Sequence, residues 1–166
     1  MTNTQPDFLV ISDSLRLRKY DGNYHLLLPG YQDPYVYQNS EGIFDEREIP
    51  DLNYVKGMCD WLAEHGELYF IEILEDGVYR PIGDVTVKQE NPPITIWFGE
   101  YRHKGIGKLV MQTVIARCRE LGYPKISNSS VYKWNTVSQK LHETLGFTKT
   151  GESETEYFYT LDLRRG

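Results

Sequence analysis

The chain has 166 residues, which at roughly 100–200 residues per domain indicates a single domain. Hydrophobic residues make up 40% of it, charged residues 25% and aromatic residues 13%, a composition that excludes disorder and collagen-like structure. The start of the chain lacks the features of a signal peptide, and no apolar run reaches the roughly 18–20 residues that span a bilayer. We therefore expect a cytoplasmic protein with no membrane partner. The cysteines, Cys59 and Cys118, exclude a disulfide framework, and we expect no metal site.

Charge is distributed unevenly along the chain. Residues 1–66 carry 11 acids and 5 bases, whereas residues 100–149 carry 3 acids and 9 bases. This polarity indicates two partners of opposite sign, an anion for the basic segment and a cation for the acidic one. The alternative is a set of solvated charged faces. Nucleic acid is not an expected partner, because the pI is about 5.2 and the basic segment lacks interleaved aromatic residues.

The first half of the chain is predicted to contain four strands and one long helix. Alternation of apolar and charged residues over 15–18 predicts a half-buried strand, and residues 21–50 are predicted to form short helical pieces and loops. Asp51 can cap a helix that ends at Gly66. The apolar face of that helix is predicted to contain Tyr54, Met58, Trp61 and Leu62. Three apolar runs, separated by turn residues, are predicted as strands at 68–74, 81–88 and 94–98.

The second half is predicted to alternate helices and strands. An apolar stripe at helical spacing predicts a helix from about Gly105 to Leu121, followed by a strand over 125–131. Asn135 can cap a second helix, which Gly146 ends. A closing pair of strands is predicted at 147–152 and 156–163. This order of elements indicates an α/β or α+β fold, with helices on both faces of a sheet.

The clearest chemical signal lies in the segment from Tyr101 to Lys108, between a strand and a helix. Gly105 and Gly107 allow the backbone to approach a ligand closely. The free N–H groups and the dipole of the first helical turn favour an anion such as phosphate. The segment matches neither a Walker A loop nor a dinucleotide-binding fingerprint. The alternative is a helix start whose glycines serve packing. Formal positive charge comes from Arg102, Lys104 and Lys108.

A second motif lies further along, where Asn135 begins a segment that ends with Leu145-Gly146-Phe147. Together the two motifs resemble the signatures of the GCN5-related N-acetyltransferase (GNAT) superfamily, in which Arg/Gln-x-x-Gly-x-Gly/Ala joins the fourth strand to the third helix. The resemblance covers about residues 14–163 and is specific over 94–147. It implies a mixed, largely antiparallel central sheet of about six or seven strands with helices on both faces.

The same resemblance implies one N-acetyltransferase domain over residues 1–166. Residues 1–13 would be an N-terminal extension. Residues 14–99 would hold the first strand, the acceptor-side helices and the central strands. Residues 100–166 would form the acetyl-CoA-binding half and the closing strands.

Acetyl-CoA is the co-substrate that the resemblance implies, with no metal. The backbone N–H groups of residues 103–108 would hold its pyrophosphate, and the strand at 95–97 would pair with the pantetheine amides as an added strand does. Asn135 would contact the pantetheine arm, or it could serve only as a helix cap. The cofactor-binding candidates are Thr95, Ile96, Trp97, Arg102, His103, Lys104, Gly105, Ile106, Gly107, Lys108 and Asn135.

Three residues are candidates for proton transfer. His142 stands where many family members have tyrosine, which implies that it protonates the leaving thiolate; it could equally be a packing residue. An amine acceptor must also lose a proton before it attacks. Glu72 and Asp84, on predicted central strands, are the candidate bases, although either could face solvent. The sequence alone does not distinguish which of these two carboxylates is the base.

The expected reaction is acetylation of the primary amine of a small cationic molecule, by direct attack in a ternary complex. Tyrosines and carboxylates between residues 31 and 51 suit a cationic acceptor. One alternative within the same chemistry is acetylation of a protein N-terminus or lysine. A non-catalytic CoA-binding regulatory module is another reading, and a homodimer is a possible assembly.

Overall fold

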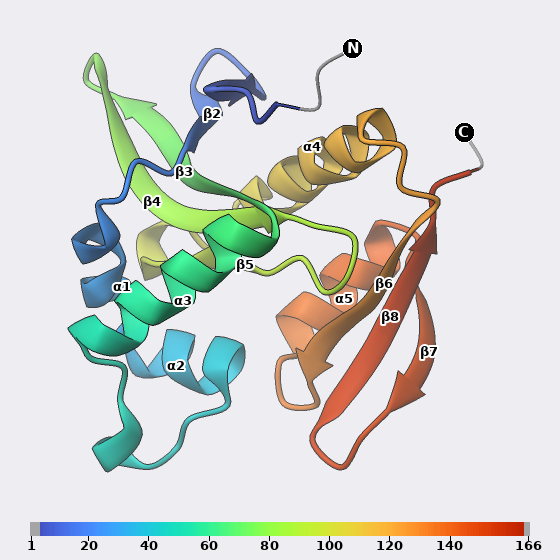
Figure 1. Ribbon diagram of the computed structural model, residues 1–166. Helices are drawn as coiled ribbons and strands as arrows, with labels where there is room; N and C mark the ends of the chain where they lie inside the picture. Colours follow the sequence, from blue (N-terminus) through green and yellow to red (C-terminus); the bar gives the residue numbers. More distant parts are fainter. Residues whose placement is uncertain (1–3, 165–166) are drawn as a thin grey trace.

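The computed structural model describes residues 4–164, whose strands form two sheets (Figure 1). The larger sheet has the strand order β1-β2-β3-β4-β5 and the smaller one the order β6-β8-β7, and all paired strands are antiparallel. The strands are β1 (Phe8–Val10), β2 (Leu15–Lys19), β3 (Glu67–Glu75), β4 (Val78–Val87), β5 (Ile94–Ile96), β6 (Lys125–Tyr132), β7 (Thr148–Glu152) and β8 (Glu156–Asp162). The expected mixed, largely antiparallel sheet is thus divided in two, and β1 lies inside the segment predicted as an extension.

The three longest helices occur in the positions that the caps and glycines predict, and the shorter α-helices lie within 21–50, the segment predicted as short helical pieces and loops. The helices are α1 (Leu28–Tyr31), α2 (Pro34–Glu41), α3 (Leu52–His65), α4 (Ile106–Glu120) and α5 (Thr136–Thr144), with 3₁₀ turns η1 (Tyr24–Leu27), η2 (Glu46–Glu48) and η3 (Gly99–Tyr101). Asp51 caps α3 by accepting from the N–H of Tyr54 at 2.8 Å. Asn135 caps α5 by accepting from the N–H of Ser138 at 3.1 Å. Both helix starts therefore confirm the prediction, because a capping side chain acts within its own turn.

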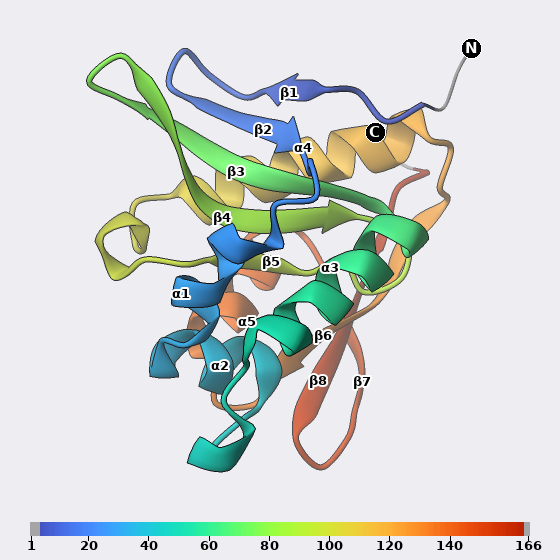
Figure 2. The same cartoon turned by 60° about the vertical axis from the view of Figure 1, so that its left-hand side comes forward.

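Strand β3 is buried on both of its faces, between two groups of helices. Tyr69 and Ile71 pack with α4, whereas Leu68 and Phe70 pack with α1 to α3. Successive side chains of a strand point to opposite faces, so a strand covered on both sides reads as a continuous apolar run. Figure 2 shows α3 and α4 on the two sides of this sheet. The helices on both faces confirm the expected architecture.

The buried face of α3 differs from the predicted one. Val55, Cys59 and Leu62 are buried, whereas Tyr54 and Trp61 are 40% and 50% exposed. Apolar spacing alone could not distinguish a face turned to the core from a face turned to a cavity. Of the predicted face, Leu62 is buried and Met58 packs partly buried against the core, whereas Tyr54 and Trp61 are exposed. Met58, Trp61 and Leu62 also line a cavity described below.

The two sheets come together near β5 and β6, which are not paired with each other. A parallel bridge joins Glu90 to Ser127, with the Ser127 N–H donating to the carbonyl of Gln89 at 2.9 Å and the Asn91 N–H donating to the carbonyl of Ser127 at 2.8 Å. Strand β5 follows this bridge and pairs with β4, while β6 pairs with β8. The separation leaves one edge of β5 without a neighbouring strand.

A buried ion pair joins α4 to β3. The guanidinium of Arg117 donates to both carboxylate oxygens of Glu67, at 2.9 and 2.8 Å, and the Tyr69 hydroxyl donates to the same carboxylate at 2.9 Å. The side chains of Arg117 and Glu67 are 8% and 12% exposed. Removing one partner would leave a buried charge without compensation.

We expect Arg117→Met to lower the free energy of unfolding by about 3–5 kcal/mol, because Glu67 loses its partner. Chemical unfolding measures the change. The double variant Arg117→Met with Glu67→Gln should recover part of the loss. Equal stabilities of the single variant and the natural protein would show that the pair does not stabilise the contact between α4 and β3.

Candidate functional site

Two adjoining cavities lie beside the unpaired edge of β5. The smaller, which we name the α4 cavity, measures about 150 Å³ and is bordered by β5, the start of α4, α2 and α5. The larger, which we name the central cavity, measures about 420 Å³ and is bordered by β4, β5, β6, α2 and α3. Both are lined by Asn39, Ser40, Ile94, Thr95, Asn135 and Ser138. A molecule seated in one cavity therefore lies next to a molecule in the other.

The edge of β5 offers backbone hydrogen-bonding groups to the α4 cavity. The Thr86 N–H of β4 donates to the carbonyl of Pro93 at 3.0 Å, and the Trp97 N–H donates to the carbonyl of Ile82 of β4 at 2.8 Å. Backbone groups of successive strand residues face opposite neighbours. The backbone groups of Ile94 and Ile96 consequently face away from β4. Thr95 and Ile96 both line the α4 cavity. An extended ligand with amide groups could pair here as an additional strand does.

The loop before α4 is shaped for close approach to its backbone. His103 and Gly105 have positive φ values of 61° and 80°, and Gly105 is the residue preceding the helix. A Cβ at Gly105 would meet no atom within 4 Å, and one at Gly107 would meet only the Leu141 side chain at 3.6 Å. The space that a side chain would occupy belongs to the cavity. The unpaired N–H groups of the first turn make it suitable for a phosphate.

The cations predicted around this loop have different positions. Arg102 folds back, donating to the carbonyl of Trp97 at 2.9 Å and of Ile96 at 3.2 Å, with its guanidinium 4.0 Å from the centroid of Tyr35. It therefore anchors the loop to the end of β5. Lys104 and Lys108 are exposed and flank the helix start without lining the cavity. Their charge remains available to an anion at the cavity rim.

Asp84 lies at the floor of the central cavity and is 1% exposed. Its Oδ2 atom accepts hydrogen bonds from the Trp97 indole at 2.7 Å and from the Tyr31 hydroxyl at 2.9 Å. Burial raises the pKa of Asp84 to about 7, against the lowering effect of these two hydrogen bonds. A carboxyl group with this pKa is suited to accept a proton near neutral pH.

Further carboxylates make the central cavity acidic. Glu41 lines it and accepts a hydrogen bond from the hydroxyl of Tyr54, and burial raises the pKa of Glu41. Glu156 also lines the cavity. Among the described lining residues there is no lysine or arginine. The cavity thus favours a positively charged group over an anion.

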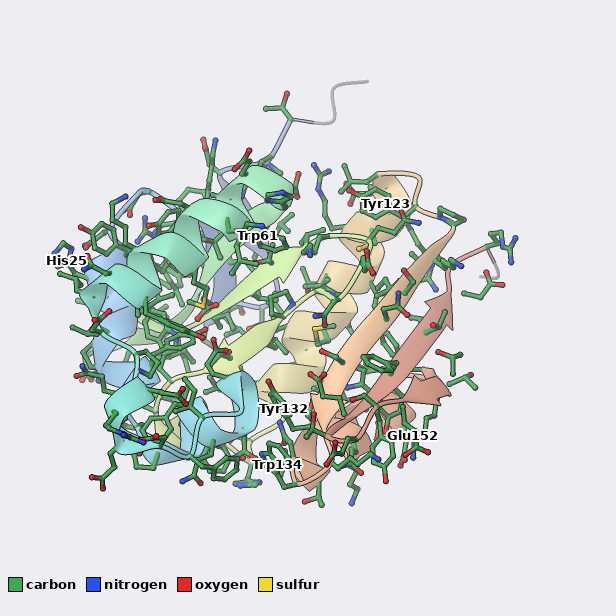
Figure 3. All side chains as sticks on the ribbon, turned by 60° about the horizontal axis from the view of Figure 1, so that its bottom comes forward. His25, Trp61, Tyr123, Tyr132, Trp134 and Glu152 are labelled. Carbon is green, nitrogen blue, oxygen red and sulfur yellow. The ribbon has the colours of Figure 1, made fainter. Side chains whose placement is uncertain are left out.

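Tyr132 lines one side of the central cavity, and its partner Trp134 lies behind it, outside the lining. Tyr132 stacks on Trp134 with a centroid distance of 4.8 Å (Figure 3). The Trp134 indole donates to the carbonyl of Gln38 at 2.9 Å, and the Asn135 amide donates to the carbonyl of Asn39 at 3.3 Å. These contacts tie α2 to the end of β6. On the α3 side, the cavity is lined by Met58, Trp61 and Leu62, three residues of the predicted helix face.

His142 is buried at the junction of β6 and α5 and also lines the central cavity. Its Nε2 atom lies 2.7 Å from the Ser129 hydroxyl, and its Nδ1 atom lies 2.7 Å from the carbonyl of Ser138. Burial lowers the pKa of His142, so the imidazole is neutral near pH 7. A neutral imidazole does not carry the extra proton that direct donation to a thiolate would use most readily.

The structure brings most of the sequence-predicted site residues together. Asp84, Thr95, Asn135 and His142 line the central cavity. The α4 cavity is lined by Thr95, Ile96, Arg102, His103, Gly105, Ile106, Gly107 and Asn135. Trp97 borders neither cavity directly and acts from beneath, through its hydrogen bond to Asp84.

Glu72 is not brought to either cavity. Its two oxygens accept from Nε of Arg16 and Nε of Arg18, both at 2.8 Å, on the side of the sheet formed by β2 and β3. The proposal that Glu72 serves as the base therefore conflicts with its placement. Asp45 and Asp51, expected near a cationic acceptor, cap η2 and α3 instead.

No local signal in the sequence selects Ser129 or Tyr54 as a functional residue. Ser129 lies within a predicted strand, and only the fold shows that its hydroxyl meets His142, thirteen positions further along the chain. Tyr54 appeared only as part of an apolar helix face, and its hydroxyl meets a carboxylate of α2. A hydroxyl on a strand or helix carries no local signal of such a long-range partner.

Comparisons with known proteins identify the family. A model of the acetyltransferase (GNAT) family matches residues 31–147, and the chain belongs to that family. Members of this family are N-acetyltransferases whose acyl donor is acetyl-CoA. Within residues 4–164, no helix is long and apolar enough to cross a membrane.

Two curated relatives are each 27% identical to this chain. Human N-acetyltransferase 8 matches over 120 residues, or 64% of this chain and 51% of that protein, so the chain spans about half of its length. The SPbeta prophage-derived uncharacterized N-acetyltransferase YokL of Bacillus subtilis matches over 156 residues, or 89% of this chain and 75% of the relative.

Solved structures share the fold over nearly the whole chain. A domain from Methanocaldococcus jannaschii has a TM-score of 0.76 and 26% identity, covering 90% of this chain and 99% of that one. The Microcin C7 self immunity acetyltransferase MccE, in complex with acetyl-CoA and AMP, has a TM-score of 0.69 and 15% identity, covering 95% and 97%. The latter likeness concerns the fold alone.

Gly107→Val tests the anion-binding role of the helix start. The added side chain would enter the α4 cavity beside Leu141 without meeting backbone, so the fold should survive. We expect acetyl-CoA to raise the Tm of the natural protein by mass action, and the variant to lose this shift. Gly57→Val, at an open position of α3 outside both cavities, is the control. A full acetyl-CoA shift in Gly107→Val would contradict the assignment.

Proposed function

We propose that this protein transfers the acetyl group of acetyl-CoA to the primary amine of a small cationic molecule, by direct attack in a ternary complex. The observation that carries the proposal is the pair of adjoining cavities, one formed at a helix start with phosphate-binding geometry and the other lined by Glu41, Asp84 and Glu156 without lysine or arginine. Family membership supports the reaction class, and the charge of the central cavity supports the class of acceptor.

The α4 cavity is the proposed donor side. The N–H groups of residues 103–108 would hold the pyrophosphate, and the edge at Ile94 and Ile96 would pair with the amides of the pantetheine arm. Acetyl-CoA supplies an activated thioester. Asn135 borders both cavities, so it is positioned to brace the arm where the thioester enters the central cavity. Much of the rate enhancement would come from holding amine and thioester together.

The central cavity is the proposed acceptor side. A lysine-like amine has a pKa of about 10.4 and arrives as an ammonium, which the carboxylates of Glu41 and Glu156 would attract. Attack requires the neutral amine, so a base must first remove a proton. Asp84 is the proposed base, because its pKa of about 7 lies near the operating pH. The hydrogen bonds from Tyr31 and Trp97 hold the carboxyl group in place.

Acetylation of a protein N-terminus or lysine is the second candidate. One structural neighbour of the chain, at 14% identity, is described as a ribosomal L7/L12 alpha-N-protein acetyltransferase. A protein acceptor would need an open groove, whereas hydrogen bonds from Trp134 and Asn135 hold α2 against the segment that follows β6, beside the central cavity. This contact favours a small acceptor. A non-catalytic CoA-binding module is disfavoured, since it would have no use for a buried carboxyl group poised to accept protons.

Asp84→Asn should lower kcat by about 100-fold or more, because the amide cannot accept the ammonium proton. It should leave the acetyl-CoA-induced Tm shift intact. The kcat of the natural protein should fall as the pH drops through about 7, where Asp84 becomes protonated. Steady-state rates against pH measure both effects. An unchanged kcat in Asp84→Asn would remove Asp84 from the mechanism.

The same variant gives an independent measure through stability. The pKa of Asp84 is raised on folding, so the native state binds more protons than the unfolded state between about pH 4 and 7. This group therefore destabilises the fold progressively as the pH rises through that window. Asp84→Asn should gain Tm relative to the natural protein at pH 8 and lose that advantage at pH 4.

The double variant Glu41→Gln with Glu156→Gln should raise the KM for a cationic amine by about tenfold or more, while changing the KM for acetyl-CoA little. The matched control is Glu46→Gln with Glu48→Gln, which removes the same charge at exposed positions outside the cavity. Equal KM values in the two double variants would contradict the proposed acceptor side.

A further inference from the structure

A buried hydroxyl–imidazole pair borders the central cavity, next to the proposed reaction centre. The Ser129 hydroxyl on β6 and Nε2 of His142 on α5 are 2.7 Å apart, and the residues are 2% and 5% exposed. Both line the central cavity, as Asp84 and Thr95 do. The rings of Phe147 and Tyr159 hold the imidazole, each with a centroid distance of 4.9 Å. The pair borders the same cavity as the proposed base.

The hydrogen bonds of His142 define its tautomer. The carbonyl of Ser138, 2.7 Å from Nδ1, can only accept. Nδ1 must therefore carry the hydrogen, which leaves Nε2 as the acceptor of the Ser129 O–H. In this state the imidazole has no proton to offer the cavity. The expectation that His142 donates directly to the leaving thiolate does not fit this geometry.

Asp84 accounts for only one of the two protons that the attacking nitrogen loses in the reaction. Acetylation of an ammonium gives an amide and a thiol, so the nitrogen loses two protons while the sulfur gains one. One proton is removed before attack, and Asp84 is the proposed acceptor for it. The second proton is lost from nitrogen after the N–C bond forms, and the sulfur needs one proton when the C–S bond breaks.

We propose that Ser129 and His142 form a proton relay that carries this second proton from the attacking nitrogen to the departing sulfur. The inference rests on the proposed acetyl transfer. After attack, the nitrogen gives its proton to Oγ of Ser129 while the Ser129 proton moves to Nε2 of His142. When the C–S bond breaks, the imidazolium returns its Nε2 proton to Oγ, and the Ser129 hydroxyl protonates the thiolate. Both side chains end as they began, so the cycle balances.

In this scheme Ser129 is the catalytic residue, because it contacts nitrogen and sulfur in turn. His142 acts through Ser129 and serves as a positioning residue that stores the proton. The carbonyl of Ser138 stabilises the imidazolium that forms, since a protonated ring still donates from Nδ1. The neutral resting state follows from burial, which lowers the pKa of His142.

The informative variants separate hydrogen bonding from proton transfer. Ser129→Ala removes the hydroxyl. His142→Gln retains one donor for the carbonyl of Ser138 and one acceptor for Ser129 but cannot take up a proton. We expect each to lower kcat by about 100-fold, with near-natural KM values and an unchanged acetyl-CoA-induced Tm shift. Ser127→Ala, on the same strand but outside both cavities, is the control.

Free thiol release from acetyl-CoA is the readout, with solvent isotope effects measured in parallel. The natural protein should show a larger solvent isotope effect on kcat than Ser129→Ala. The variants are compared with an amine and also with water as the acceptor. A wrong acceptor class would then abolish amine turnover without altering the ratio between variants, so the failure of the proposed function is distinguishable from the failure of the relay.

Three results would overturn the relay. The first is a kcat of His142→Gln equal to that of the natural protein, which would show that hydrogen bonding to Ser129 suffices for catalysis without proton uptake by His142. The second is an Nε2–H tautomer of His142 in ¹⁵N NMR spectra of the resting protein, where we expect Nδ1–H. The third is an acetyl group on Ser129 in the quenched enzyme, detected by mass spectrometry, which would make Ser129 a nucleophile instead of a proton carrier.

Discussion

Strand β5 has hydrogen-bonding groups on two edges but a partner strand on only one of them. It pairs with β4, and beyond the bridge between Glu90 and Ser127 the next strand, β6, belongs to the other sheet. Backbone donors and acceptors away from solvent need partners, so an open edge inside a fold is a natural place for an extended ligand. The two cavities exist because this edge is left open.

The two cavities around this edge differ in charge, and of the acidic segment 1–66 only Glu41 contributes a carboxylate to the central cavity. The basic segment supplies the start of α4 and the flanking lysines, whereas carboxylates from α2, β4 and β8 line the central cavity. An anionic donor and a cationic acceptor are thus drawn to neighbouring cavities without competing for one. Some acidic residues outside the cavity have structural roles instead; Asp51, for example, caps α3.

Protons are handled by two separate groups in the central cavity. Asp84 is made basic by burial and is held by two hydrogen bonds from Tyr31 and Trp97. His142 is kept neutral by burial and has its tautomer fixed by a backbone carbonyl. Burial favours the uncharged form of each group, which raises the pKa of the acid and lowers that of the imidazole.

The sequence by itself determined the features that depend on neighbours within a few residues. The caps at Asp51 and Asn135, the left-handed glycine before α4 and the doubly buried run of β3 all follow from local sterics, local hydrogen bonds or periodicity. The family motifs at 94–147 belong to this group, because a helix start that binds phosphate is built from one short segment. The order of the strands and helices followed from the same signals, apart from β1, which lies in a segment with no predicted strand.

Only the tertiary structure decided which side chains meet. Glu72 and Asp84 have similar strand contexts, but pairing with β2 gives Glu72 two arginines, while α1 gives Asp84 a tyrosine and the segment after β5 gives it a tryptophan. The sequence likewise did not predict which face of α3 borders a cavity, nor the contact of Ser129 with His142. Such contacts join residues distant in the chain, so they depend on how whole elements pack, and no local pattern of residues encodes that packing.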